Sequence, residues 1–196
     1  MQDDAPSDHC PAERLAAAAS EFADGALGLE RAEALLAHYP RDPRLHFLKG
    51  SLLAGLGRYD EARGAMQAAV EMAPDYALAR FQLGFLLLTS GEAGAAREVW
   101  APLQRLEPEA PLRLFAAGLN LLIEDRFAEA VQALQHGIDR NPDLEPMNRD
   151  MRLIIAQVQA LQTGASPPAA AAAEDKPEVS AAHLLLRRYT APPTRH

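Results

Sequence analysis

The chain has 196 residues, of which 48% are hydrophobic and 6% are aromatic. This size and composition suit one folded domain or a short repeat protein, and they exclude a wholly disordered chain. The 27 acidic residues outnumber the 19 lysines and arginines, so the formal net charge is −8 at pH 7. Such an acidic balance argues against nucleic acid or an anionic membrane as the main partner.

The N-terminal part of the sequence shows no targeting signal. Residues 1–11 contain acids and prolines but no apolar run, unlike a secretory signal. The single cysteine, Cys10, excludes an intramolecular disulfide and a cysteine-based metal cage. The longest strongly apolar run, 81–88, is far too short to cross a bilayer. The many alanines and arginines are typical of a GC-rich bacterial genome, and we expect a cytoplasmic protein without membrane insertion.

The first predicted elements form an irregular helix pair. Residues 1–10 are mostly polar and are expected to be disordered. The helical spacing of apolar residues then predicts helices over 11–22 and 27–38, ahead of Pro40. We assign this degenerate pair to residues 11–42.

Three units of 34 residues follow, at 43–76, 77–110 and 111–144. The same residue types recur at this step without any insertion. The recurring columns are Phe47, Phe81 and Phe115; Gly50, Gly84 and Gly118; Leu53, Leu87 and Leu121; Ala62, Ala96 and Ala130; and Pro74, Pro108 and Pro142. So many aligned columns indicate one structural unit that is repeated three times.

Each unit predicts two helices joined by a tight turn. In the first unit, Asp42 is a suitable N-cap and Pro43 suits the first helical position. Gly57 can adopt the left-handed conformation that ends a helix, and the second helix, 59–72, must end before Pro74. Turns are expected at the three equivalent positions, Gly57, Gly91 and Asp125.

The regular pattern changes at two places. Pro102 lies inside the predicted second helix of the middle unit, where it removes a backbone hydrogen bond. We expect a late break there, after which the helix re-forms over 103–106. Beyond Pro142, apolar residues at helical spacing predict a capping helix over 145–162, which would cover the end of the last repeat.

These residues resemble the pattern of the tetratricopeptide repeat family. The recurring glycine, alanine and proline columns stand at its small and terminal positions, and Tyr59 and Phe127 supply the aromatic that opens the second helix. Ala93 replaces this aromatic in the middle unit. The resemblance is strongest over 43–144, and it implies an all-α fold, a solenoid of antiparallel helix pairs that spans 11–162.

The resemblance also implies a binding surface, because the first helix of each pair in this family lines a concave groove. The residues expected on that face are Phe47, Leu78, Phe81, Phe85, Leu88, Leu112, Phe115, Leu119 and Leu122. So dense an apolar face exceeds what a monomer usually exposes, which favours a bound apolar segment. The alternative is that bulky side chains close the groove. If the face binds a partner, glutamate at Phe81 or Phe115 should leave the fold mostly intact.

The C-terminal residues differ from the repeats in composition. Residues 163–178 are rich in alanine and proline and predict a flexible linker. The last segment, 179–196, is apolar and basic. The residues expected to make its contacts are Leu184, Leu185, Leu186, Arg187, Arg188 and Tyr189. They suit either docking onto an apolar surface of this acidic protein or recognition by another protein.

No catalytic constellation is found in the sequence. The six histidines show no pair at a metal-ligand spacing, and there is neither a glycine-rich phosphate loop nor a nucleophile elbow. We therefore expect no enzymatic activity, no cofactor and no metal.

The sequence as a whole favours an adaptor or scaffold that binds an apolar helical or extended segment of another protein. Two alternatives stay open. One is a secretion-type chaperone that shields a client's apolar segment, although the long linker and tail argue against this class. The other is a structural subunit of a bacterial assembly. The sequence indicates neither the identity of the partner nor the oligomeric state.

Overall fold

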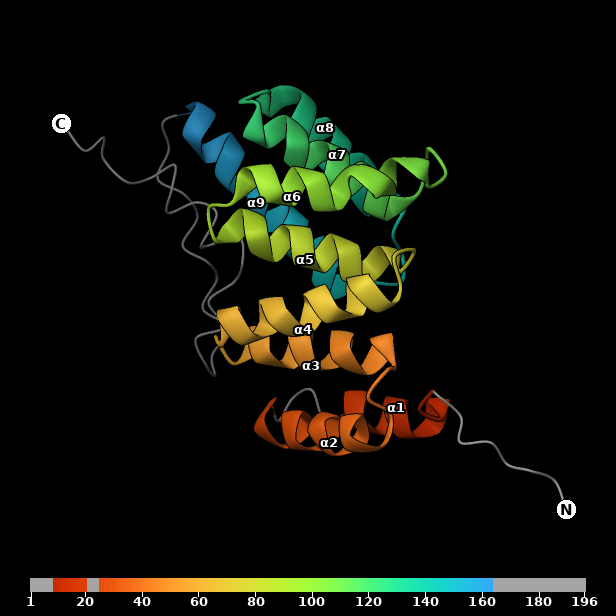
Figure 1. Ribbon diagram of the computed structural model, residues 1–196. Helices are drawn as coiled ribbons and strands as arrows, with labels where there is room; N and C mark the ends of the chain where they lie inside the picture. The colour runs from red at the N-terminus through yellow and green to blue at the C-terminus, as the bar shows by residue number, and fades with distance from the viewer. Residues whose placement is uncertain (1–8, 21–24, 164–196) are drawn as a thin grey trace, which may run out of the picture. The chain divides into compact units, whose positions relative to one another are not determined.

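The computed structural model describes residues 9–20 and 25–163 of the chain. All regular elements in these residues are helices (Figure 1). They are α1 (Ala12–Ser20), α2 (Gly25–His38), α3 (Pro43–Gly55), α4 (Tyr59–Met72), α5 (Ala77–Thr89), α6 (Ala93–Trp100), the 3-10 helix η2 (Ala101–Arg105), α7 (Pro111–Ile123), α8 (Phe127–Asp139) and α9 (Glu145–Thr163). Helices that follow one another pack as pairs, α3 with α4 and α7 with α8. The predicted all-α class of paired helices is confirmed.

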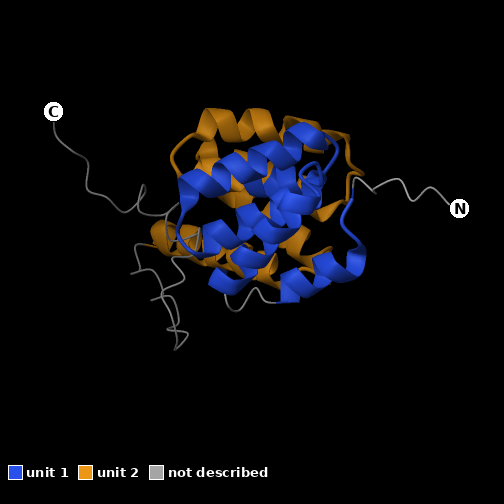
Figure 2. Cartoon of the chain, turned by 60° about the horizontal axis from the view of Figure 1, so that its bottom comes forward, with its two compact units in different colours: residues 1–83 blue, residues 84–196 orange. Residues whose placement is uncertain are grey.

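The chain divides into two compact units, residues 1–83 and 84–196 (Figure 2). The sequence pattern predicts one continuous array over 11–162 and gives no sign of this division. The border lies inside α5, between Leu83 and Gly84. This helix therefore contributes its first half to one unit and its second half to the other.

In the first unit, α3 and α4 pack closely because Gly50 has no side chain. A Cβ atom on Gly50 would lie 2.6 Å from the Cγ atom of Met66 and 3.2 Å from the carbonyl oxygen of Ala62. In addition, α2 packs against α3, and α1 contacts both of these helices. The largest fully buried side chains of α3 are Leu45, Leu52 and Leu53.

In the second unit, α7 and α8 form the corresponding close pair. A Cβ atom on Gly118 would lie 2.7 Å from the Cγ atom of Leu134. The last helix, α9, packs on α8 and covers the range predicted for the capping helix. The large apolar side chains that α9 buries are Met147, Met151, Ile154, Ile155 and Val158.

The break predicted at Pro102 is present in another form. The α-helix ends at Trp100, and Pro102 lies near the start of the 3-10 helix that follows directly. Proline cannot donate the hydrogen bond that an α-helix needs at this place, and a 3-10 turn is a common way to continue a helix end. The α-helical segment expected over 103–106 is not formed.

The three predicted turns are confirmed by the backbone. Gly57 has φ 74°, Gly91 has φ 87° and Asp125 has φ 58°, and no other described residue has a positive φ. At the last turn, the N–H group of Arg126 donates to the carbonyl of Leu121 at 3.0 Å, which closes the end of α7. Asp125 is thus an L-residue at a place where the other two turns use glycine.

Replacing Asp125 by glycine should raise the free energy of unfolding by about 0.5–1 kcal/mol. The left-handed conformation costs a residue with a side chain roughly 1–2 kcal/mol, and the greater freedom of glycine in the unfolded chain offsets part of this gain. The change also removes a carboxylate from the negative end of the α7 dipole. Urea unfolding measures the difference, and an unchanged or lower stability would contradict this account of the turn.

Candidate protein-binding surface

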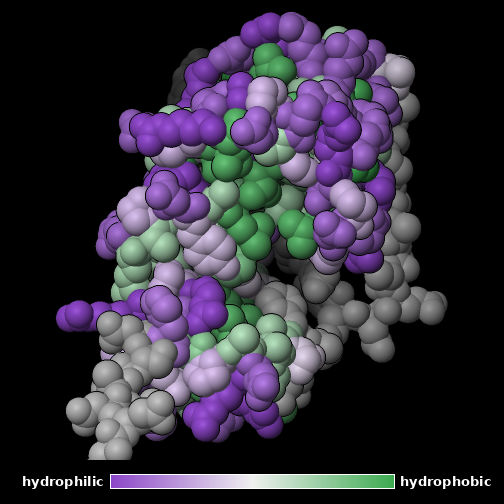
Figure 3. Space-filling model, turned by 90° about the vertical axis from the view of Figure 1, so that its right-hand side faces the viewer, coloured by the Kyte–Doolittle hydropathy of each residue, from purple (hydrophilic) through white to green (hydrophobic). Residues whose placement is uncertain are grey.

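The structure places six of the nine predicted groove residues in the hydrophobic core. These six are at most 5% exposed: Phe81, Phe85, Leu88, Phe115, Leu119 and Leu122. The other three, Phe47, Leu78 and Leu112, are half-buried. On the face drawn in Figure 3, hydrophobic residues do reach the surface, between wide hydrophilic borders. The dense apolar face expected from the sequence is therefore accessible at only part of its predicted positions.

Phe115 shows why its position is buried. A Cβ atom on Gly137 of α8 would lie 2.5 Å from the Cδ1 and Cε1 atoms of the Phe115 ring. The ring therefore packs on the backbone of the helix that is paired with its own. A carboxylate placed there would lose its water without gaining a partner, which is strongly unfavourable. From this packing we expect Phe115→Glu to destabilise the fold, unlike the expectation from the sequence alone.

Part of the predicted face stays accessible in the first repeat. Phe47 of α3 and Tyr76, which directly precedes α5, are both half-buried. Their ring centroids lie 5.3 Å apart and the rings are tilted by 59°, a favourable arrangement for two aromatic side chains. Arg44 and Ser51 lie about one turn before and after Phe47 on the same side of α3. We call Arg44, Phe47, Ser51 and Tyr76 the first-repeat surface.

A buried carboxylate holds Arg44 in place. Asp42 caps α3, because its Oδ1 atom accepts from the backbone N–H and the Nε atom of Arg44, both at 3.0 Å. Its Oδ2 atom accepts from the Nη2 atom of Arg44 at 2.6 Å and from the backbone N–H of Cys10 at 2.8 Å. Arg44 Nη2 also donates to the carbonyl of Cys10 at 2.6 Å. The chain around Cys10 is therefore tied to the start of α3.

These contacts also set the charge of the site. Burial alone would raise the pKa of Asp42, but hydrogen bonds from Arg44 and from the Cys10 N–H group hold it below its ordinary value of 3.8. The hydrogen bond to Asp42 raises the pKa of Arg44. Burial raises the pKa of Tyr76 above its ordinary value of 10.0. At neutral pH the site therefore holds an ionised Asp42–Arg44 pair beside a neutral tyrosine.

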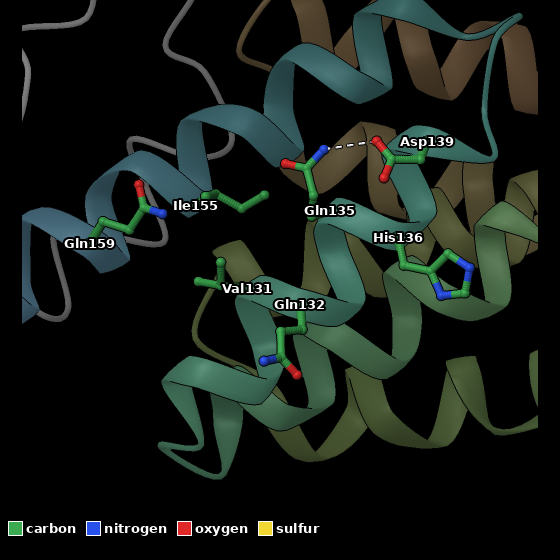
Figure 4. A pocket seen from close by; sticks show the side chains of 7 residues that line it. All are labelled: Val131, Gln132, Gln135, His136, Asp139, Ile155 and Gln159. Carbon is green, nitrogen blue, oxygen red and sulfur yellow. Dashed lines mark hydrogen bonds between the residues drawn. The ribbon is translucent and has the colours of Figure 1, made fainter.

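A second candidate is an open pocket of about 460 Å³ between α8 and α9 (Figure 4). Its lining consists of Val131, Gln132, Gln135, His136 and Asp139 of α8 and Ile155 and Gln159 of α9. Gln135 Nε2 donates to Asp139 Oδ1 at 2.9 Å, and His136 Nε2 lies 2.9 Å from Glu109 Oε2. This α8–α9 pocket offers carboxamides and apolar contacts, which suits binding rather than covalent chemistry.

Sequence reasoning missed both Tyr76 and the α8–α9 pocket. Tyr76 is the last residue of the first repeat and directly precedes the first helix of the second repeat. Because the first helices line the groove in this family, the repeat spacing could have indicated that Tyr76 lies near it. The pocket has no such signal, because it depends on how α9 lies against α8. The residues predicted to form the tail contacts, at 184–189, lie outside the described part of the chain.

The described residues contain neither a cluster of metal ligands nor a helix suited to cross a membrane. No group of three or more histidine, cysteine or acidic side chains within 9–20 and 25–163 could hold a metal ion. None of the helices in these ranges combines the length and the apolar character that a transmembrane span requires.

Comparisons with known proteins agree with the repeats and the fold. Two family models described as tetratricopeptide repeat match residues 13–77 and 53–117, which together make up more than half of the chain. No curated protein matches the sequence. The solved structure "MamA 41-end from Desulfovibrio magneticus RS-1" is 15% identical and has a TM-score of 0.54, with 93% of this chain and 100% of that chain covered.

A second solved structure, "MamA RS-1 ArsTM double mutant", is 16% identical and also has a TM-score of 0.54. It covers 92% of this chain and 99% of its own. At such low identity the likeness shows the fold alone. The helix pairs, the period of the sequence and the two family matches lead to one conclusion: this chain belongs to the tetratricopeptide repeat family.

Proposed function

We propose that this chain is a protein-interaction scaffold that holds an apolar helical or extended segment of another protein, with its first contact at the first-repeat surface. The observation that carries the proposal is the half-buried ring pair of Phe47 and Tyr76. Aromatic side chains that are already fixed bury a large area at little entropic cost, which makes them typical centres of protein interfaces. The repeat family and the paired helices support the same role.

The polar members of the first-repeat surface favour a partner segment that can form hydrogen bonds through its peptide groups beside an apolar side chain. The Arg44 side chain is 36% exposed although Asp42 holds it, so it is accessible to a partner. The Ser51 hydroxyl donates to the carbonyl of Phe47 at 3.0 Å, and its oxygen can still accept a hydrogen bond. An apolar side chain on the rings, flanked by peptide groups, would therefore match this surface.

The other predicted groove residues take different parts in the proposal. Leu78 is half-buried and follows Tyr76 closely in the chain, so it extends the apolar contact of the first unit. Leu112 is half-buried in the second unit. Among the six buried residues, Phe81 belongs to the first unit and the other five belong to the second. We propose none of them as a first contact with a partner.

Alanine in place of Phe47 or Tyr76 should weaken partner binding at least about tenfold, which corresponds to roughly 1.4 kcal/mol. A photo-crosslinking amino acid at Ser51 would first identify the partner by mass spectrometry, and calorimetry with the purified partner would then give the Kd. Circular dichroism would verify that each variant is folded.

The matched control is alanine in place of Met72, an apolar residue that is 44% exposed at the end of α4. This variant should bind the partner as tightly as the original protein. If the Phe47 and Met72 variants bind equally well, the first-repeat surface is not the binding site. If crosslinks at Ser51 return no partner, the scaffold role itself loses its support.

A further inference from the structure

The α8–α9 pocket has two ends of different chemistry. Val131 is half-buried and Ile155 is 8% exposed, so they give the pocket an apolar floor near Gln159. The exposed Asp139 lies two turns further along α8, where Figure 4 shows it on the far side of Gln135. The pocket thus runs from an apolar end, beside the C-terminal half of α9, to an acidic end.

The carboxamides that line the pocket suit an extended peptide. Gln132, Gln135 and Gln159 are exposed, and each side chain carries both a donor and an acceptor. Peptide groups need both kinds of partner, and amide side chains can supply both. Gln135 already donates to Asp139 at 2.9 Å, which leaves its amide oxygen to accept.

The chain itself provides a segment that starts beside this pocket. The helix α9 ends at Thr163, one turn beyond Gln159, and 33 further residues follow up to His196. The stretch 164–178 has 15 residues, and a flexible chain of this length spans an r.m.s. distance of about 20–25 Å. A tethered segment has a high effective concentration at a site within this reach.

The order of residues in that segment matches the order of groups in the pocket. From Leu184 to Arg188 an extended chain covers about 13 Å, while α8 rises by about 12 Å from Val131 to Asp139. Leucine at the apolar end therefore places arginine at the acidic end. Residues 177–196 also carry more basic than acidic residues, whereas the whole chain has a net charge of −8.

We propose that residues 184–188 of this chain dock into the α8–α9 pocket of the same molecule. The leucines contact Val131 and Ile155, and Arg187 or Arg188 pairs with Asp139. The glutamine carboxamides bind the peptide groups between them. This contact lies on α8 and α9 rather than on α3, so it does not depend on the proposed partner site. An experiment can therefore refute the docking of the tail and leave the proposed function untouched.

Paramagnetic relaxation tests this docking in the full chain. A nitroxide is attached to the new cysteine of a Thr190→Cys variant, in which Cys10→Ala removes the protein's own cysteine. The amide signals of Gln132, Gln135 and Asp139 should lose most of their intensity, and reduction of the nitroxide should restore it. Unchanged signals at these residues would overturn the proposal.

Matched variants test the pocket itself. Arginine at both Gln135 and Gln159 adds bulk and positive charge that repels Arg187 and Arg188, so the loss of signal should disappear. Arginine at Gln104, an exposed residue of η2 outside the lining, should leave it unchanged. Equal broadening in both variants would overturn the docking site.

A mixed sample distinguishes docking within one molecule from docking between two copies. Isotope-labelled protein without nitroxide is combined with unlabelled protein that carries it. Docking within one molecule predicts no broadening in this sample, whereas broadening would mean that the pocket receives the tail of another copy and would contradict the proposal.

Discussion

Leucine in place of Gly84 should destabilise the protein by about 3 kcal/mol or more, because α5 and α6 leave no room for any side chain there. A Cβ atom on Gly84 would lie 2.2 Å from Trp100 Nε1 and 2.6 Å from Trp100 Cδ1. Trp100 is 0% exposed, so its ring cannot turn toward solvent without opening the core. Overpacking of this kind forces shifts of backbone and side chains that typically cost 1–3 kcal/mol for smaller insertions.

Alanine at the same position gives the sharper comparison. In an open helix, alanine in place of glycine stabilises by about 0.5–1 kcal/mol. Gly64 of α4 is exposed and a Cβ atom there would meet nothing within 4 Å, so Gly64→Ala should show this gain. Gly84→Ala should instead lower the midpoint of urea unfolding. A gain in stability at both positions would contradict the close contact of α5 with Trp100.

Alanine in place of Asp42 should lower the free energy of unfolding by about 2–4 kcal/mol. The change removes the N-cap of α3, worth about 0.5–2 kcal/mol, and leaves the buried N–H group of Cys10 without its acceptor, at roughly 1–3 kcal/mol. The Arg44 side chain is 36% exposed, so water replaces part of its lost pairing. Asparagine, a good N-cap without charge, should cost less than alanine.

The pH dependence of stability tests the charge of Asp42 separately. The pKa of this carboxyl is lower in the folded protein than its ordinary value of 3.8. Its ionised form therefore stabilises the folded state fully above pH 3.8, and this contribution is lost as the pH falls through the lowered pKa. The difference in unfolding free energy between the original protein and Asp42→Asn should shrink over this acidic range. A difference that is constant with pH would contradict the ionised pair.

Features that depend on the repeat period could be predicted from the sequence. The turns at Gly57, Gly91 and Asp125 and the close contacts at Gly50, Gly84 and Gly118 follow from backbone sterics at fixed steps. These constraints act within one helix pair, so the same residue types recur at the same positions of each repeat. The helix starts at Pro43 and Pro111 follow for the same reason, because proline suits a first helical position.

The accessible site could be predicted only in part, because neighbours outside the period decide which side chains are buried. Phe47 and Phe115 hold the same place in their repeats, yet Phe47 is half-buried and Phe115 is buried. Gly137, at the place that Ala69 holds in the first repeat, gives the Phe115 ring its space. The hydrogen bond from the Cys10 N–H group to Asp42 joins residues 32 positions apart. It does not recur in the other repeats, so no repeated sequence pattern predicts it.

The border between the two compact units has a consequence for how such a protein can gain or lose length. It cuts through the hydrogen-bonded backbone of α5, whereas the repeats begin at Pro43, Ala77 and Pro111, where helices start. A duplication or deletion that joins at these helix starts keeps every helix whole. One that joins at Leu83–Gly84 would splice two half-helices and disturb the contact of Gly84 with Trp100. Exchange of the 34-residue repeat therefore keeps whole helices, whereas exchange of the compact unit does not.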